Sequence, residues 1–471
     1  MLVDVRTHGT ATQIEGPLLF LRRNINVGLN DAVEVIDALG RKRLGRIATL
    51  DDEHMIIEVL ESTSGLSLAD TTVRFMGEAL HFGVGPDLLG RILDGVGRPL
   101  DGGPPVSATQ RLRIDGAAIN PAAREYPRDF IETGISSIDL MNSLVRGQKL
   151  PIFSGSGLPH DRLATEIARH AKLLGEEAGT FAVVFVAIGV SYDIAEQFRR
   201  AMENSGALEH TALFLNLASD SSTQRLLAPR YALTAAEYLA YSEDRHVLVI
   251  MTDMTNYCEA LREVSASHGE IPSRKGYPGY MYSDLATLFE RAGCIMGKAG
   301  TLTQLPILTI PSDDITHPIP DLTGYITEGQ IVLDRELDRR DIYPPIRVLP
   351  SLSRLMKDGT GKGFTHDDHP ALANQLYAAY ARAMHVRVLA SIMGSEGLSE
   401  HDQLFLQFGD RFEQELLQQD SARSLEQSME IGWRLLQHIP VLELTRLSDE
   451  QIQRHIKVQP IAQDQAGEDA G

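Results

Sequence analysis

From about residue 145 to residue 350, nearly continuous apolar runs alternate with segments of helical periodicity. The apolar runs are KLPIF, TFAVVFVAIG, TALFLNL, HVLVIMTD and LTQLPILTI, and a helical pattern follows each of the first four. A strand that is apolar on both faces must be buried on both faces, and a parallel sheet covered by helices on each side provides that burial. We therefore predict an α/β domain with a parallel sheet in the middle of the chain.

The regions on either side of this domain have different patterns. Before residue 75, five short strand-like segments are separated by Gly, Asn or Asp, which is typical of a small β-barrel or sandwich. These segments are ATQIEGPLLFL, DAVEVID, KRLGRIATL, HMIIEVLE and TTVRFM. The Gly/Pro-rich residues 90–105 favour turns and a linker. After about residue 370 only helical spacing remains, in ALANQLYAAYARAMHVRVLASI, HDQLFLQFGDRFEQELLQQ and SLEQSMEIGWRLLQHI.

The predicted organisation is therefore multi-domain. We expect an N-terminal β-barrel at residues 1–75 and a nucleotide-binding-type α/β domain at 76–350. A C-terminal helical domain is expected at 351–460. Residues 461–471 have no apolar anchor, which predicts a disordered tail.

Charge and hydropathy exclude several classes of protein. The net charge of −20 over 471 residues argues against sequence-independent nucleic-acid binding, which needs clustered Lys and Arg. The longest apolar run, at residues 181–190, is too short to span a bilayer, and no N-terminal signal pattern is present. Cys258 and Cys294 form no C-x-x-C motif, so a reducing compartment is expected. Any connection to a membrane is expected to go through partners.

The segment SGSGLPHD at residues 154–161 has the length and the strand-to-helix context of a phosphate-binding loop, G-x-x-x-x-G-K-[ST]. In that alignment Pro159 replaces the second Gly, His160 replaces the Lys, and Asp161 replaces the Ser or Thr. The candidate nucleotide-contacting residues are Ser154, Gly155, Ser156, Gly157, Leu158, Pro159, His160 and Asp161.

Each replacement weakens phosphate binding. Pro159 removes one N–H donor, and His160 is shorter than Lys and mostly neutral at pH 7. Asp161 is expected to cap the N-terminus of the following helix, and its charge repels a phosphate. The helix is expected to carry Leu163, Ile167, Ala171 and Leu174. Two interpretations stay open from these residues alone: a Gly-rich turn before a helix, or a degenerate phosphate loop.

The surrounding segments resemble the B (beta) subunits of V/A-type rotary ATPases and ATP synthases over nearly the whole chain. The resemblance is carried by LGRILDGVGRPLDGGP, ETGISSIDLMNSLVRGQKLPIFSGSGLPH, FVAIGVSYDIAEQF, GYPGYMYSDLATLFERAG, IPDLTGYITEGQIVLDR and YPPIRVLPSLSRLMKDG. The usual loop of this family, FSxxGLPHN, also lacks the Lys. Two departures are Asp161, where Asn is common, and Arg347, where the wider family has Asn or Asp.

The resemblance implies a three-domain subunit that alternates with catalytic A subunits in a ring around a rotating stalk. It places a catalytic Glu of active relatives at Val190, which cannot position water. Asp253, at the end of HVLVIMTD, stands where a Mg²⁺-directing carboxylate belongs, and the alternative is a carboxylate that accepts loop N–H bonds. Without the Lys and the Glu, efficient hydrolysis at this chain's own site is not expected.

Three smaller features have structural alternatives. Tyr325 could stack on an adenine or could be an ordinary core residue. The THDDH segment at residues 365–369 could bind a metal, although such a polar loop usually contacts water. The Gly/Pro loop at residues 271–285 resembles the family's loop near the central stalk and the contact between subunits.

Arg354 is the expected catalytic contribution of this chain. By itself it is an arginine on a predicted short helix that ends near Gly359, where a solvated surface residue is usual. The resemblance places it in the segment that supplies an arginine finger to the neighbouring A subunit, and Lys357 is the second candidate. A guanidinium suits that role because it is always charged and can bind two phosphate oxygens.

The sequence therefore predicts a non-catalytic, regulatory subunit of a proton- or sodium-translocating rotary ATPase or ATP synthase. ATP or ADP is expected at the interface with the A subunit, with Mg²⁺ held mainly by that subunit and no nucleotide held tightly by this chain alone. Expected partners are the A subunit in an A3B3 ring and the central and peripheral stalks, at the cytoplasmic face of a membrane. The alternatives are a catalytic ATPase subunit, a ring-shaped nucleic-acid translocase, and a scaffold that binds no nucleotide.

Overall fold

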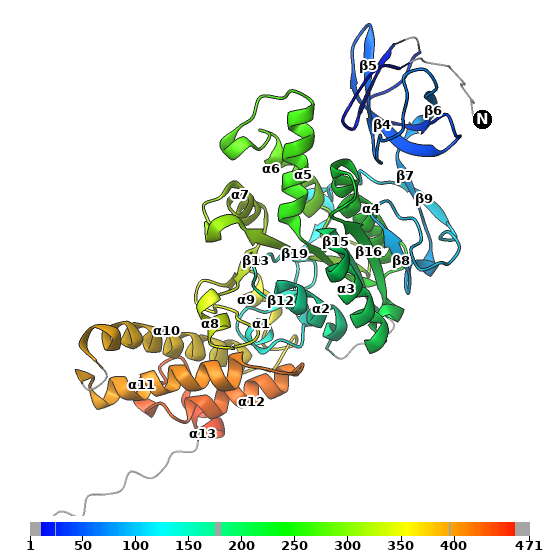
Figure 1. The fold of residues 1–471 in the computed structure, drawn as a ribbon. Helices are drawn as coiled ribbons and strands as arrows, with labels where there is room; N and C mark the ends of the chain where they lie inside the picture. The colour runs from blue at the N-terminus through cyan, green and yellow to red at the C-terminus, as the bar shows by residue number, and fades with distance from the viewer. Residues whose placement is uncertain (1–10, 24, 175–179, 395–396, 457–471) are drawn as a thin grey trace, which may run out of the picture.

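The computed structural model describes residues 11–23, 25–174, 180–394 and 397–456. A strand-rich N-terminal region, a central sheet with helices and a helical C-terminal region follow one another along the molecule (Figure 1). This order confirms the predicted fold class. The tail predicted at residues 461–471 lies outside the described residues.

Six antiparallel strands form the N-terminal sheet in the order β1-β2-β5-β4-β3-β6. Their bounds are β1 Ala11–Glu15, β2 Leu18–Arg22, β3 Asp31–Ile36, β4 Lys42–Leu50, β5 His54–Val59 and β6 Thr72–Ala79. Alternate side chains such as Val33, Val35 and Ile57 are fully buried in one apolar core, as the period of a half-buried strand requires. The first predicted segment is a hairpin, because Gly16 has a φ of +54° and makes a turn between β1 and β2.

The central sheet has the strand order β21-β20-β13-β19-β17-β15-β16-β8, and all neighbours except β20 and β21 are parallel. Its strands are β8 Ile92–Asp94, β13 Ile152–Gly155, β15 Phe181–Val190, β16 Thr211–Leu217, β17 His246–Thr252, β19 Thr301–Ile310, β20 Gly329–Val332 and β21 Leu352–Ser353. β18 Gly293–Ile295 adds antiparallel to β19, and β10 Arg124–Glu125 adds to β18. The prediction of a parallel sheet is confirmed.

One prediction about the Gly/Pro-rich segment at residues 90–105 was wrong. β8 lies inside it and forms the edge strand beside β16, with Leu93 opposite Phe214. Leu93 is fully buried. Three apolar or half-apolar residues between glycines are too few to show a strand in the sequence, and the pairing with a distant strand decides the conformation.

Helices cover both faces of the sheet (Figure 1). α2 His160–His170 and α3 Tyr192–Ser205 share a core with Val183, Phe185 and Ala187 of β15, whereas α4 Ser222–Tyr241 and α5 Met254–Ser267 pack on the opposite face. α6 Met281–Phe289 and α7 Pro318–Ile326 lie beside each other on the α4–α5 side. The helix predicted from Asp161 is shorter than expected. It ends at His170, and Lys172–Leu173 form the short strand β14 instead.

Short elements join the sheet to its surroundings. They are β7 His81–Val84 with β9 Gln110–Arg113, β11 Phe130–Glu132 with β12 Leu144–Val145 and β14, and the helices α1 Ser136–Asp139, α8 Arg335–Arg339 and α9 Met356–Gly359. The β11–β12 hairpin leads directly into β13.

The C-terminal region consists of helices, as predicted. α10 His369–Met393 packs against α11 Glu400–Arg411 and α12 Leu425–Leu436, and α13 Asp449–His455 follows. At Phe412 the helix after α11 continues as a π-helical segment to Leu417, which the sequence pattern does not reveal. Phe408, Phe412 and Leu436 are fully buried in the core of this region.

Candidate functional site

The predicted phosphate loop lies at the carboxyl edge of the central sheet, between β13 and α2. Its backbone turns at Gly157, whose φ of +81° is the left-handed conformation that glycine adopts easily. Position and connectivity are therefore those of a phosphate loop. This supports the degenerate-loop interpretation over an unrelated Gly-rich turn.

The side chain of His160 is folded back into this loop. Its Nδ1 lies 3.0 Å from the carbonyl oxygen of Leu158 and 3.1 Å from the hydroxyl oxygen of Ser154. A carbonyl oxygen can only accept, so Nδ1 carries the proton in that contact. The group that replaces the phosphate-binding lysine thus holds the loop itself.

Asp161 does not cap the helix as expected. The N-cap residue is Pro159, with no side-chain cap bond, and the Asp161 carboxylate instead accepts from the hydroxyl of Thr252 at 3.5 Å and lies 3.6 Å from His160 Nε2. Burial raises the pKa of Asp161; nearby Asp253 adds to the rise, and His160 opposes it. Two carboxylates therefore face the place where a bound phosphate would lie.

Asp253 performs the structural task that was the alternative to Mg²⁺ binding. It is the N-cap of α5, and one carboxylate oxygen accepts from the backbone N–H groups of Thr255 at 2.8 Å and Thr309 at 3.1 Å. These bonds tie the ends of β17 and β19 together. A role in directing Mg²⁺ stays a prediction.

An ion pair that the sequence reasoning missed lies against the loop. Arg335 contacts both carboxylate oxygens of Asp313 and donates to the carbonyl oxygen of Ser156 at 2.9 Å. A Cβ added at Gly155 would lie 2.4 Å from Asp313 and 2.8 Å from Arg335, so this position needs glycine. The cation nearest the loop is therefore already neutralised. Only the fold brings it there, because Arg335 is 179 residues from Ser156.

The remaining positions of the expected nucleotide site are apolar or distant. Val190 ends β15 and is 6% exposed within the core, so no carboxylate is present at that strand end. Tyr325 lies at the last turn of α7 and is 73% exposed, so the core interpretation was wrong. α7 begins after the carboxyl end of β19 and leads back to Glu328, whose N–H bonds to Lys149 before β13. Tyr325 thus lies toward the edge opposite the phosphate loop, and stacking on a base held by that loop is not supported.

Arg354 lies at the end of the sheet that β21 and β20 form. It occupies a turn between β21 and α9 rather than a helix, which corrects the prediction, and its side chain is exposed. A cavity of about 570 Å³ lies beside it, with Lys357, Leu352 and Tyr377 in its lining. Among the residues described, the lining contains no Asp or Glu. In a chain of net charge −20, such a surface suits an anionic group.

The THDDH segment has structural roles. His369 is fully buried, with Nε2 3.0 Å from the carbonyl oxygen of Leu140 and Nδ1 3.0 Å from the hydroxyl of Thr365. Asp368 contacts Arg454 and His455. No group of three potential metal-ligating His, Cys, Asp or Glu side chains occurs in the described part of the chain.

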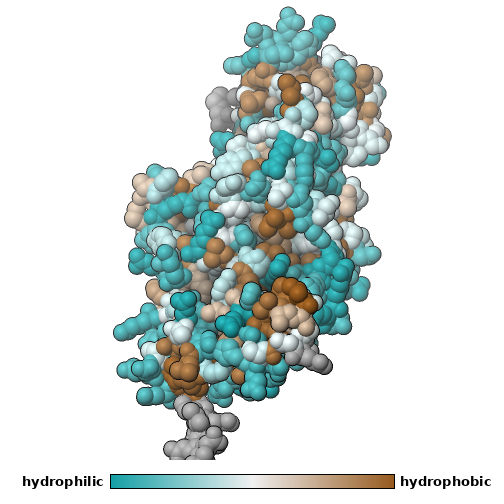
Figure 2. Space-filling model, turned by 90° about the vertical axis from the view of Figure 1, so that its left-hand side faces the viewer, coloured by the Kyte–Doolittle hydropathy of each residue, from teal (hydrophilic) through white to brown (hydrophobic). Residues whose placement is uncertain are grey.

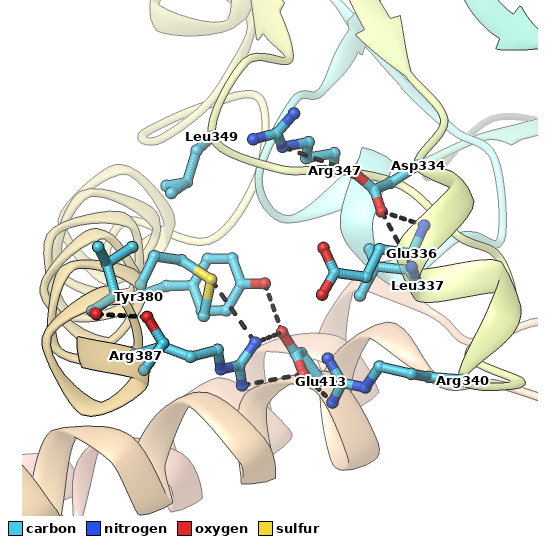
Figure 3. A pocket seen from close by; sticks show the side chains of 12 residues that line it. Asp334, Glu336, Leu337, Arg340, Arg347, Leu349, Tyr380, Arg387 and Glu413 are labelled. Carbon is cyan, nitrogen blue, oxygen red and sulfur yellow. Dashed lines mark hydrogen bonds and ion pairs between the residues drawn. The ribbon is translucent and has the colours of Figure 1, made fainter. Parts of the chain in front are cut away.

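A second cavity, of about 420 Å³, lies between α8 and the C-terminal helices (Figure 3). At its floor, Glu413 of the π-helical segment is 1% exposed and accepts from Tyr380, Arg387 and Arg340. Arg347, one of the two departures from the family pattern, lies on the opposite wall, with Nε 3.6 Å from Asp334. The Arg340–Glu413 pair joins the sheet region to the helical region.

The outer surface is mostly hydrophilic with separate hydrophobic patches (Figure 2). At the end of α10, Val388, Ile392 and Met393 are more than half exposed. In the loop that begins at residue 271, Ile271 is 91% exposed and Lys275 pairs with Asp314 at 2.9 Å. No helix among the described residues combines the length and the apolar character needed to cross a membrane.

Comparison with known proteins agrees with this geometry. The ATP synthase alpha/beta family is matched by its nucleotide-binding domain at residues 134–353 and its β-barrel domain at 11–77, and the C-terminal domain of V and A type ATP synthase at 358–456. The B subunit of the A-type ATP synthase of Aeropyrum pernix is 54% identical over 457 residues, which cover 97% of this chain and 98% of that protein. This chain belongs to the B-subunit family of A-type ATP synthases.

Two further relatives extend the match. The first of the numbered B subunits of the A-type ATP synthase of Methanospirillum hungatei is 54% identical over 453 residues, or 96% of this chain and 98% of that protein. The solved structure of the ATP synthase subunit NeqB from Nanoarcheaum equitans is 38% identical, with a TM-score of 0.71 over 89% of this chain and 98% of that one. The recognition drawn from the sequence is confirmed. As a member of this family the chain is a subunit of an ATP synthase complex and carries its nucleotide-binding domain.

Proposed function

We propose that this chain is the non-catalytic, regulatory B subunit of a proton- or sodium-translocating A-type ATP synthase. It alternates with the catalytic A subunit in an A3B3 ring and supplies Arg354 to the nucleotide bound by its neighbour. The central and peripheral stalks bind this ring, and the ion-translocating sector connects it to the membrane at the cytoplasmic face.

The observation that carries the proposal is the closed phosphate loop. His160 bonds to Leu158 and Ser154 within the loop, and Arg335 is neutralised by Asp313. Asp161 adds negative charge at the start of α2. A γ-phosphate would find no free cation among these groups, although phosphoryl transfer depends on positioning and charge neutralisation.

The exposed Arg354 supports the complementary half of the proposal. It lies beside a cavity whose described lining is free of carboxylates, so a phosphate approaching from another chain meets no repulsion there. Mg²⁺ is then held mainly by the A subunit, and ATP or ADP lies at the interface between subunits. Nucleotide bound by this chain alone is weak.

The test measures steady-state ATP hydrolysis by the isolated chain, by the A subunit alone and by the reconstituted mixture, with the stoichiometry of the two chains determined on the same samples. We expect turnover only in the mixture, at equal stoichiometry. Robust turnover by the isolated chain would instead establish a catalytic subunit. A mixture no more active than the A subunit alone would leave only a scaffold role.

A further inference from the structure

The turn that carries Arg354 is held by a small number of contacts to β20. The N–H of Arg354 donates to the carbonyl oxygen of Glu328 at 3.0 Å, and Ser353 pairs with Gly329 across β21 and β20. A Cβ at Gly329 would lie 1.9 Å from the carbonyl oxygen of Leu352. Glycine at this position therefore allows the turn to lie directly against the sheet.

A fully buried amide grips both sides of this turn. Nε2 of Gln148 donates to the carbonyl oxygen of Glu328 at 3.1 Å and to the hydroxyl of Ser353 at 2.9 Å. Its Oε1 accepts from the N–H of Val145 at 3.0 Å, which fixes the orientation of the amide. The hydroxyl of Ser353 in turn donates to the carbonyl oxygen of Ser143 at 2.8 Å.

The adjacent residue locks Glu328 itself. The backbone N–H of Lys149 donates to one carboxylate oxygen of Glu328 at 2.8 Å, and its ammonium group lies 2.9 Å from the other. The N–H of Glu328 returns a bond to the carbonyl oxygen of Lys149 at 3.0 Å. The Lys149 ammonium also contacts Glu290 at 3.0 Å, and Lys149 is 4% exposed. Glu328 is thus bonded through both its backbone and its side chain.

We propose that Gln148 is a positioning residue for Arg354, and that the Lys149–Glu328 pair supports it. The inference rests on the proposed function, in which Arg354 acts on a phosphate held by another chain. An exposed side chain on a short turn can place its guanidinium reproducibly only if the turn is rigid. Catalytic groups misplaced by about 1 Å can lose roughly 100-fold in rate.

The substitution Gln148→Met keeps the length and burial of the side chain and removes both donated bonds. In rings reconstituted with the A subunit, we expect kcat to fall about 10- to 100-fold while KM for ATP stays within about twofold. The matched control is Gln375→Met. Gln375 is 2% exposed and bridges Glu443 and Arg446 in the helical region, away from the Arg354 turn. It should leave kcat within about twofold.

A double substitution and a measurement on the isolated chain make the test specific. With Arg354→Ala already present, Gln148→Met should lower kcat no further, because its effect passes through that arginine. Hydrogen exchange of the Arg354 amide in the isolated chain should accelerate about tenfold or more in Gln148→Met, and not in Gln375→Met.

The outcomes separate the inference from the function on which it rests. If Arg354→Ala rings keep normal turnover, the proposed function fails, whatever Gln148→Met does. If Arg354→Ala abolishes turnover but Gln148→Met has the wild-type kcat, the positioning role alone is overturned. If Gln148→Met does not fold, Ser353→Ala removes a single hydroxyl from the same contact. It should lower kcat in the same direction by a smaller factor, and an unchanged kcat would overturn the inference.

Discussion

Nδ1 of His160 lies 3.1 Å from the hydroxyl oxygen of Ser154, so the two ends of the phosphate loop are joined to each other. In an active loop the corresponding lysine reaches outward to the terminal phosphates. Here the same position closes the loop, and Asp161 adds a carboxylate next to it. The site has kept its backbone and exchanged its ligand contacts for internal ones.

The substitution Asp161→Asn should raise the affinity of the isolated chain for ADP by about 3- to 10-fold, because one full negative charge is removed near the phosphate position. Isothermal titration calorimetry in the presence of Mg²⁺ measures it. Asp193→Asn, which removes an exposed carboxylate from the first turn of α3, is the control and should change nothing. Equal affinities in all three proteins would show that charge does not limit binding here.

The substitution Arg354→Ala should leave expression and ring assembly intact and reduce ATP hydrolysis by the assembled ring roughly 10³-fold or more, the lower range for an arginine supplied in trans. Arg354→Lys should also fail, because an ammonium group cannot bind two phosphate oxygens side by side. Lys357→Ala is the neighbouring control, with a smaller loss. Near-normal turnover in the Ala variant would make Arg354 an ordinary surface residue.

The substitution Glu413→Gln should destabilise the chain by about 1–3 kcal/mol, because it leaves Arg340 and Arg387 without their shared carboxylate, while their partial exposure limits the loss. Burial by itself raises the pKa of Glu413, but the bonds from Arg387 and Arg340 outweigh it and hold the pKa below its ordinary value. The stabilising contribution is therefore present above the unfolded pKa and is lost as the pH falls through the folded one. Urea unfolding at pH 7 measures the difference, with the exposed Glu426→Gln as control. An unchanged free energy of unfolding would show that this contact is not stabilising.

His369 predicts a loss of stability in acid. Burial lowers its pKa from 6.5 to about 4, so the folded state holds the imidazole neutral. Its contribution is complete above pH 6.5 and is lost as the pH falls toward 4, by about 3 kcal/mol in all. His369→Gln cannot titrate and should flatten the pH dependence of the unfolding free energy in this window. Identical slopes for the two proteins between pH 6.5 and 4 would contradict the assignment.

Much of the architecture followed from local patterns. The apolar runs that became β15, β16, β17 and β19 could be recognised because strands buried on both faces have no polar positions. β8 could not, since three residues between glycines carry no period and take their conformation from pairing with β16.

For the site, the sequence by itself determined which groups are missing: the lysine at His160 and the glutamate at Val190. Only the tertiary structure decided what stands in their place. Arg335 reaches Ser156 across 179 residues and Gln148 reaches Ser353 across 205. No local period encodes such contacts, because they form only when parallel strands bring distant loops to one edge of the sheet. The identity of a side chain is a local property, whereas the partner that satisfies a buried donor or charge is a property of the whole fold.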